Sequence, residues 1–114
     1  MRVHYLEIVT PDVDATCAIH AAMHRLDFGP ADPDLGHARV AESSDGCLVG
    51  VRSPLADHEA PIVRTYVEVE DIARAVAAAE EGGALVAYPP TRQGKRGTFA
   101  ILIAGELQHG LWQE

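Results

Sequence analysis

Two short stretches of the chain repeat the same alternation of ring, apolar and acidic side chains. Residues 5–8 read Y-L-E-I, and residues 66–69 read Y-V-E-V. Successive side chains of a β-strand point to opposite faces, so in each stretch the phenol and the carboxylate share one face. Arg64 precedes the second stretch and falls on the same face as Tyr66. A carboxylate beside an arginine and aromatic rings could supply a general base, an anchor for an anionic group and a stacking surface.

These two faces form the predicted ligand site. Strand parity also places Trp112, close to the end of the sequence, among the inward-facing residues. The predicted ligand-binding residues are Tyr5, Glu7, Arg64, Tyr66, Glu68 and Trp112. Glu7 and Glu68 are the candidates for a catalytic base, but the residues alone do not identify a catalytic group.

A second interpretation of the same carboxylates is structural. Glu7 and Glu68 could pair with Arg64, Arg39 or Arg52 in a buried network that closes the site. The recurrence of Tyr-x-Glu in both halves favours this interpretation slightly, because a catalytic residue more often differs between the two copies of a repeat. Both interpretations remain open at the level of the sequence.

The remaining histidine and cysteine patterns do not predict a metal site. His20 and His24 have the i, i+4 spacing that can chelate a metal on a helix. They fall beside the apolar stripe of their helix, so we expect a solvated or half-buried pair. Cys17 and Cys47 fit no metal-ligand spacing and are expected to be mostly buried free thiols.

The composition describes one globular domain of 114 residues. Apolar residues make up 47% of the chain and aromatic residues only 5%, so the core must be aliphatic. The net charge of −8 argues against nucleic acid and anionic membranes as partners. No apolar run approaches the ~20 residues that span a bilayer, and no signal-peptide pattern is present, so a cytoplasmic location is expected.

The first half of the chain predicts a β-α-β-β-β unit. Thr10 and Pro11 mark the beginning of a helix that runs to about Leu26, with Thr10 as its cap. The apolar stripe of this helix comprises Ala15, Ala18, Ile19, Ala22, Met23 and Leu26. Strands are expected at Val3–Val9, near Phe28, at His37–Glu42 and at Cys47–Arg52.

The second half repeats this order after a linker at about residues 54–61. Asp71 is expected to cap a helix over Ile72–Glu81, which Gly82 and Gly83 end. Strands are expected at Ile62–Glu70, Leu85–Tyr88, Thr98–Ala104 and Gln108–Gln113, and a proline pair stops the second of them at Pro89. The sequence therefore predicts an α+β domain of two tandem βαβββ modules, at about residues 1–53 and 62–114.

The order and spacing of these motifs resemble the vicinal oxygen chelate superfamily, which includes glyoxalase I, bleomycin-resistance proteins and extradiol dioxygenases. The small single-domain glyoxalase/bleomycin-resistance proteins are the most similar group. The resemblance is carried by Y-L-E-I-V-T-P-D at 5–12, Y-V-E-V-E-D at 66–71, G-G-A at 82–84, V-A-Y-P-P-T at 86–91, F-A-I-L at 99–102 and G-L-W-Q at 110–113. It implies that each module curls its sheet into a half-open cup, that two cups enclose a ligand cavity, and that the protein is a homodimer.

The resemblance does not extend to the metal ligands of the superfamily. Metal-dependent relatives hold a divalent ion with His, Gln or Glu side chains from the first and last strands of each module. The corresponding positions in this sequence fall on Tyr5, Arg64 and Gly110, while His4 lies one step away on the opposite strand face. Arginine remains protonated and has no lone pair to give a metal. No family-type metal centre is therefore predicted.

These observations predict a glyoxalase/bleomycin-resistance-like protein that binds a small organic ligand without a metal cofactor. Whether it is also an enzyme stays open. One alternative is a metal-dependent lyase, isomerase or dioxygenase of the same superfamily, using His4 and carboxylates. Another is a non-catalytic dimeric scaffold.

Overall fold

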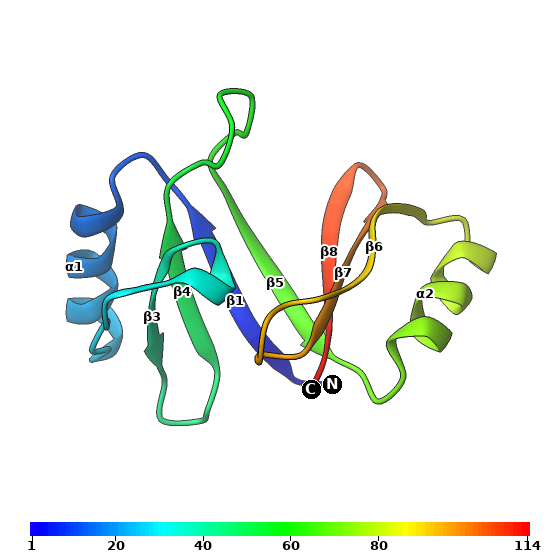
Figure 1. Ribbon diagram of the computed structural model, residues 1–114, viewed down its shortest axis with the longest axis horizontal. Coiled ribbons are helices and arrows are strands. Elements are labelled where there is room, and N and C mark those ends of the chain that lie inside the picture. The colour runs from blue at the N-terminus through cyan, green and yellow to red at the C-terminus, as the bar shows by residue number, and fades with distance from the viewer. The chain divides into compact units, whose positions relative to one another are not determined.

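Figure 1 shows the computed structural model, which describes the whole chain from Met1 to Glu114. It contains eight strands, two α-helices and one short 3-10 helix. The chain divides into two compact units. The first unit is residues 5–63, and the second unit is residues 1–4 together with residues 64–114. No helix is long and apolar enough to cross a membrane.

The first unit contains four strands and one helix on one face of their sheet (Figure 1). The strands lie in the order β2-β3-β4-β1, with β1 parallel to β4 and the other neighbours antiparallel. In chain order the elements are β1 (Val3–Val9, whose first residues belong to the second unit), α1 (Val13–His24), β2 (Ala31–Asp32), a 3-10 helix (Pro33–Leu35), β3 (Ala38–Glu42) and β4 (Leu48–Arg52).

The second unit repeats this arrangement. Its strands lie in the order β5-β8-β7-β6, with β5 parallel to β8. The elements are β5 (Ile62–Glu68), α2 (Ile72–Glu81), β6 (Leu85–Arg92), β7 (Thr98–Ala104) and β8 (Leu107–Gln113). The predicted α+β architecture of two βαβββ modules is therefore confirmed.

Each helix forms a small aliphatic core with one face of its own sheet. In the first unit Cys17 of α1 packs with Ile8 and Val51. In the second unit Ile72 and Val76 of α2 pack with strand residues of β7, notably Leu102. The opposite face of each sheet carries no α-helix and holds polar residues such as Glu7, Arg52 and Arg64, whereas Arg39 and Gln113 hydrogen-bond to the helices on the other face.

The predicted orientation and beginning of α1 are wrong. Ile19 and Met23, placed on its buried stripe, are both 57% exposed, whereas Cys17 is buried. An alanine-rich helix offers more than one apolar face, and the stripe that packs is the one through Cys17 and not the one with the larger side chains. The helix begins after Asp12, whose N–H donates to the Thr10 hydroxyl, so Thr10 lies outside the helix and does not cap it.

The predicted end of β6 is also wrong, because the strand continues through Pro89 and Pro90 to Arg92. β6 is the edge strand of its sheet, where prolines are tolerated because one side of the strand has no neighbour to pair with. Two register shifts between Val86 and Thr91 accommodate the irregular pairing with β7. The short second strand lies at Ala31–Asp32, a few residues after the predicted position near Phe28.

Candidate functional site

The helix-free face of the second unit carries a row of aromatic rings. Tyr66 and Trp112 meet edge to face with ring centroids 5.7 Å apart, and Phe99 lies 6.2 Å from the first and 6.4 Å from the second. Tyr88 of the edge strand stacks on Phe99 at 5.1 Å. Tyr66 pairs with Gly110 in register, and a side chain at that glycine would overlap the tyrosine ring. The glycine therefore makes room for the ring.

Arg64 lies on the same strand as Tyr66 and is only 7% exposed. Its guanidinium carbon lies 5.9 Å from the centroid of the Tyr66 ring, at cation–π distance. One of its amino groups donates a hydrogen bond to the Gln108 side chain. The guanidinium is thus held by the protein itself on the helix-free face.

Glu68 follows Arg64 and Tyr66 in the alternation of β5. It lies in a cluster with His4 and Glu114. The Nδ1 atom of His4 lies 3.0 Å from Oε1 of Glu68 and 3.2 Å from Oε1 of Glu114. The guanidinium of Arg2 lies 3.6 Å from the second oxygen of Glu68. The hydrogen bond to His4, with a smaller contribution from the charge of Arg2, lowers the pKa of the Glu68 carboxyl below its ordinary value.

The imidazole of His4 is fixed by its surroundings. The residue is 8% exposed, and its ring stacks on Trp112 with centroids 5.1 Å apart. The indole Nε1 in turn donates a 2.9 Å hydrogen bond to the carbonyl oxygen of Arg96. The chain beside His4 is held by the Glu68 N–H, which donates to the Arg2 carbonyl at 2.8 Å. One backbone contact and one ring stack therefore position the histidine.

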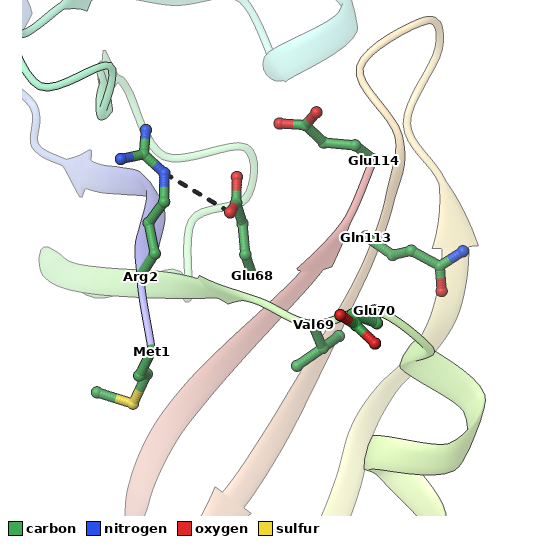
Figure 2. Close-up of a pocket in the computed structure, with 7 residues that line it drawn as sticks. All are labelled: Met1, Arg2, Glu68, Val69, Glu70, Gln113 and Glu114. Atoms are coloured by element: carbon green, nitrogen blue, oxygen red, sulfur yellow. Dashed lines mark ion pairs between the residues drawn. The ribbon is translucent and has the colours of Figure 1, made fainter.

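A pocket of about 510 Å³ opens beside this cluster (Figure 2). Its lining comprises Met1, Arg2, Glu68, Val69, Glu70, Gln113 and Glu114. Figure 2 shows the ion-paired side chains of Arg2 and Glu68 directed toward each other at one side of it. Three of the lining residues are acidic and one is basic, so the pocket is negatively charged.

Tyr5 and Glu7 lie in the first unit. Glu7 accepts a 2.9 Å hydrogen bond from Nε of Arg52, which also donates to both carboxylate oxygens of Glu59 at 2.9 and 2.7 Å. The hydrogen bonds to Glu59 and Glu7 raise the pKa of Arg52 further above its ordinary value. The Tyr5 ring covers Gly50, where a side chain would overlap it. Glu7 is thus part of a largely buried ion-pair network.

Among the predicted ligand-binding residues, the structure brings Arg64, Tyr66, Glu68 and Trp112 together in the second unit. His4, Arg2 and Glu114 are not among the predicted ligand-binding residues, although the metal-dependent alternative uses His4 with carboxylates. Glu114 follows Gly110 and Trp112 in the alternation of β8, so one further step of strand parity would have found it. No sequence signal places His4 beside Trp112, because that contact depends on long-range pairing.

The residues at the positions that hold metal ligands in the vicinal oxygen chelate superfamily are not suited to bind a metal ion. Arg64 offers no lone pair, Gly110 has no side chain, and the ring of Tyr5 packs over Gly50. His20 is half-buried and His24 exposed, and their rings lie 5.7 Å apart on α1. The potential metal ligands that do converge are His4, Glu68 and Glu114, whose donor atoms all lie within 4.8 Å of one another.

The comparisons with known proteins identify the fold. No protein-family model and no curated protein sequence matches the chain. A hypothetical protein from Bacillus halodurans superposes with a TM-score of 0.79 at 13% identity, over 99% of this chain and 94% of its own. Methylmalonyl-CoA epimerase from Mycobacterium tuberculosis gives 0.74 at 13% identity, over 97% of this chain and 86% of its own.

A Streptomyces coelicolor methylmalonyl-CoA epimerase in complex with 2-nitronate-propionyl-CoA gives a TM-score of 0.71 at 17% identity, over 100% of this chain and 97% of its own. The chain therefore has the βαβββ fold of the glyoxalase-like, vicinal oxygen chelate proteins. Identities this low show the fold alone, so chemistry must be argued from the residues of this chain.

Proposed function

We propose that this protein is a glyoxalase/bleomycin-resistance-like protein that binds a small organic ligand without the metal centre of its metal-dependent relatives. The observation that carries the proposal is the pocket beside Glu68 (Figure 2). Its walls combine apolar side chains, Met1 and Val69, with a few convergent charged groups. This combination is typical of small-molecule sites. The solved epimerases of the same fold, which are described with CoA-ester ligands, support small-molecule binding in general.

The charge of the pocket indicates the class of ligand. Glu68, Glu70 and Glu114 outnumber Arg2, and the whole chain has a net charge of −8. A phosphate-rich ligand such as a CoA thioester would meet like charge in this pocket. We therefore expect a neutral or cationic molecule, such as an amine with an apolar portion, and not a CoA ester.

Binding of cationic ligands can be tested with thermal shift and calorimetry. Amines, carboxylic acids of matched size and a CoA thioester are compared on the same protein. A ligand at 100 times its dissociation constant adds about 2.7 kcal/mol to the free energy of unfolding, so a true ligand gives a clear shift. Amines should stabilise the protein, and Glu68→Gln and Glu114→Gln should each weaken that effect.

Glu106→Gln provides the matched control, because Glu106 is an exposed residue in the turn before β8 and does not line the pocket. It should leave the amine effect unchanged. Stabilisation by the CoA thioester and not by amines would contradict the proposed ligand class. Absence of stabilisation by every class would favour a non-catalytic scaffold.

Metal-dependent lyase, isomerase or dioxygenase activity is a second candidate function, favoured by the convergence of His4, Glu68 and Glu114. It requires an ion at a place other than the family positions.

Homodimerisation also remains a prediction from the resemblance, and sedimentation of the purified protein measures it.

A further inference from the structure

The cluster of His4, Glu68 and Glu114 has an unusual balance of charge. A single nitrogen, Nδ1 of His4, lies within 3.2 Å of an oxygen from each carboxylate. A neutral imidazole offers at that atom either one N–H or one lone pair, so it cannot fully satisfy two carboxylates. Two carboxylates that share a site repel each other unless a positive charge lies between them. The guanidinium of Arg2 lies 3.6 Å from Glu68, farther than the imidazole nitrogen.

The spacing of the donor atoms matches the spacing of ligands around a metal ion. Two ligands at about 2.1 Å from one ion lie roughly 3.0 Å apart in an octahedron and roughly 3.4 Å apart in a tetrahedron. The nitrogen-to-oxygen separations of 3.0 and 3.2 Å fall in this range. The third separation, between the two carboxylate oxygens, is bounded by the 4.8 Å within which all three donor atoms lie.

We propose that His4, Glu68 and Glu114 form a binding site for a divalent transition-metal ion on the second unit. One imidazole nitrogen and two carboxylate oxygens are a ligand set suited to Zn²⁺, Mn²⁺, Fe²⁺ or Co²⁺. The hard ions Mg²⁺ and Ca²⁺ prefer oxygen ligands alone, so we expect them to bind much more weakly.

This site is distinct from the metal site of the resembling family. Glu68 lies four residues beyond Arg64, and Glu114 lies four residues beyond Gly110. Four residues of strand span roughly 13 Å. The proposed ion would therefore lie near the far ends of β5 and β8, away from the positions that Arg64 and Gly110 occupy.

The histidine is prepared for this role by its packing. Its ring is buried and stacked on Trp112, whose indole is held by the Arg96 carbonyl. A ligand whose orientation is fixed before the metal arrives loses less conformational freedom on binding. Glu68 and Glu114 also line the pocket of Figure 2, so the open coordination positions of the ion would face that pocket.

The sole tryptophan of the chain provides a direct readout, because the His4 ring stacks on it. Chelator-treated protein without an affinity tag is titrated with Co²⁺, which quenches nearby indole fluorescence, and then with Zn²⁺ in competition. We expect saturable quenching with about one Co²⁺ per chain, reversed by Zn²⁺ and not by Mg²⁺. Calorimetry with ZnCl₂ alone gives the affinity and the stoichiometry.

The ligand variants are His4→Ala, Glu68→Gln and Glu114→Gln. Loss of His4 should abolish the quenching, and each glutamine should weaken Zn²⁺ binding at least roughly tenfold, the scale seen when support for a metal ligand is removed. The double variant His20→Gln/His24→Gln is the matched control for the other histidine pair and should change nothing. Circular dichroism verifies that each variant is folded.

Two results would overturn the site. One is the absence of saturable Zn²⁺ binding to the folded protein. The other is binding that survives His4→Ala or disappears in the His20/His24 control. The titration uses metal alone, so its result does not require that an amine binds, although both proposals place a positive charge against Glu68 and Glu114.

Discussion

The Nε atom of Arg52 lies 2.9 Å from Oε2 of Glu7, and both side chains are almost completely buried. The same guanidinium holds both oxygens of Glu59 in a two-pronged contact. Glu7 is therefore engaged in the structure of the first unit. Of the two interpretations open for this residue from the sequence, the geometry favours a structural ion pair over a catalytic base.

Removing the cation from this network should destabilise the protein strongly. Arg52→Met leaves the Glu7 carboxylate buried without its partner, and breaking a buried pair in this way costs about 3–5 kcal/mol. Urea denaturation monitored by circular dichroism measures the loss. Asp14→Asn is the control, because it breaks the Arg39–Asp14 pair, in which Asp14 is 91% exposed. That change should cost less than about 1 kcal/mol. Similar losses for the two variants would contradict a structural role for Glu7–Arg52.

The two helices differ in how their first turns are capped. The Asp71 side chain accepts a 3.1 Å hydrogen bond from the Arg74 N–H, whereas Asp12 makes no side-chain cap at the corresponding position of α1. Asp71→Ala should therefore cost about 1 kcal/mol of unfolding free energy. Asp12→Ala should cost clearly less, because only the interaction of its charge with the helix dipole is lost. Denaturation of both variants under the same conditions makes the comparison, and an equal loss would argue against this difference.

The success of the sequence predictions depended on how local each signal was. The Asp71 cap and the amphipathic run behind it predicted α2 at Ile72–Glu81, and the segment between the 91–97 loop and the turn at 105–106 was predicted as a strand at Thr98–Ala104; the structure has both ranges unchanged. The α1 stripe failed because packing against the sheet selects Cys17 from several apolar faces. The metal-dependent alternative named His4 but could not identify Glu68 and Glu114 as its partners, because their approach depends on pairing between residues distant in the sequence.

Gly50 of β4 and Gly110 of β8 each lie beneath a tyrosine from the first strand of their module, although Gly110 pairs in register with Tyr66 and Gly50 pairs with Glu7. A β-carbon at Gly110 would lie 2.5 Å from the Tyr66 ring, and one at Gly50 would overlap the Tyr5 hydroxyl. Gly50→Ala and Gly110→Ala should each cost about 1–3 kcal/mol through overpacking. Gly29→Ala is the control, because its new methyl group would meet its nearest neighbour, the Val40 carbonyl oxygen, at an ordinary 3.7 Å. Thermal denaturation of the three variants tests this ranking, and a tolerated Gly110→Ala would refute the tight ring contact.

Burial raises the pKa of the Cys17 thiol above its ordinary value of 9.0, with Arg39 opposing the effect only in part. The folded state therefore binds the thiol proton more tightly than the unfolded chain does. The contribution of this thiol proton to the free energy of unfolding is therefore complete below pH 9.0. It is lost as the pH rises through the folded-state pKa of Cys17.

Cys17→Ala should consequently reduce the decline in unfolding free energy between about pH 7 and about pH 10, measured from urea midpoints. Other groups titrate in the same range, so the difference between wild type and variant carries the information. Cys47→Ala is the control, because Cys47 is only half-buried, and the decline should persist in it. Alkylation of native protein adds an independent measure: Cys17 should react much more slowly than Cys47, and both should react at similar rates after unfolding. Equal native rates would mean that α1 does not hold Cys17 against the sheet.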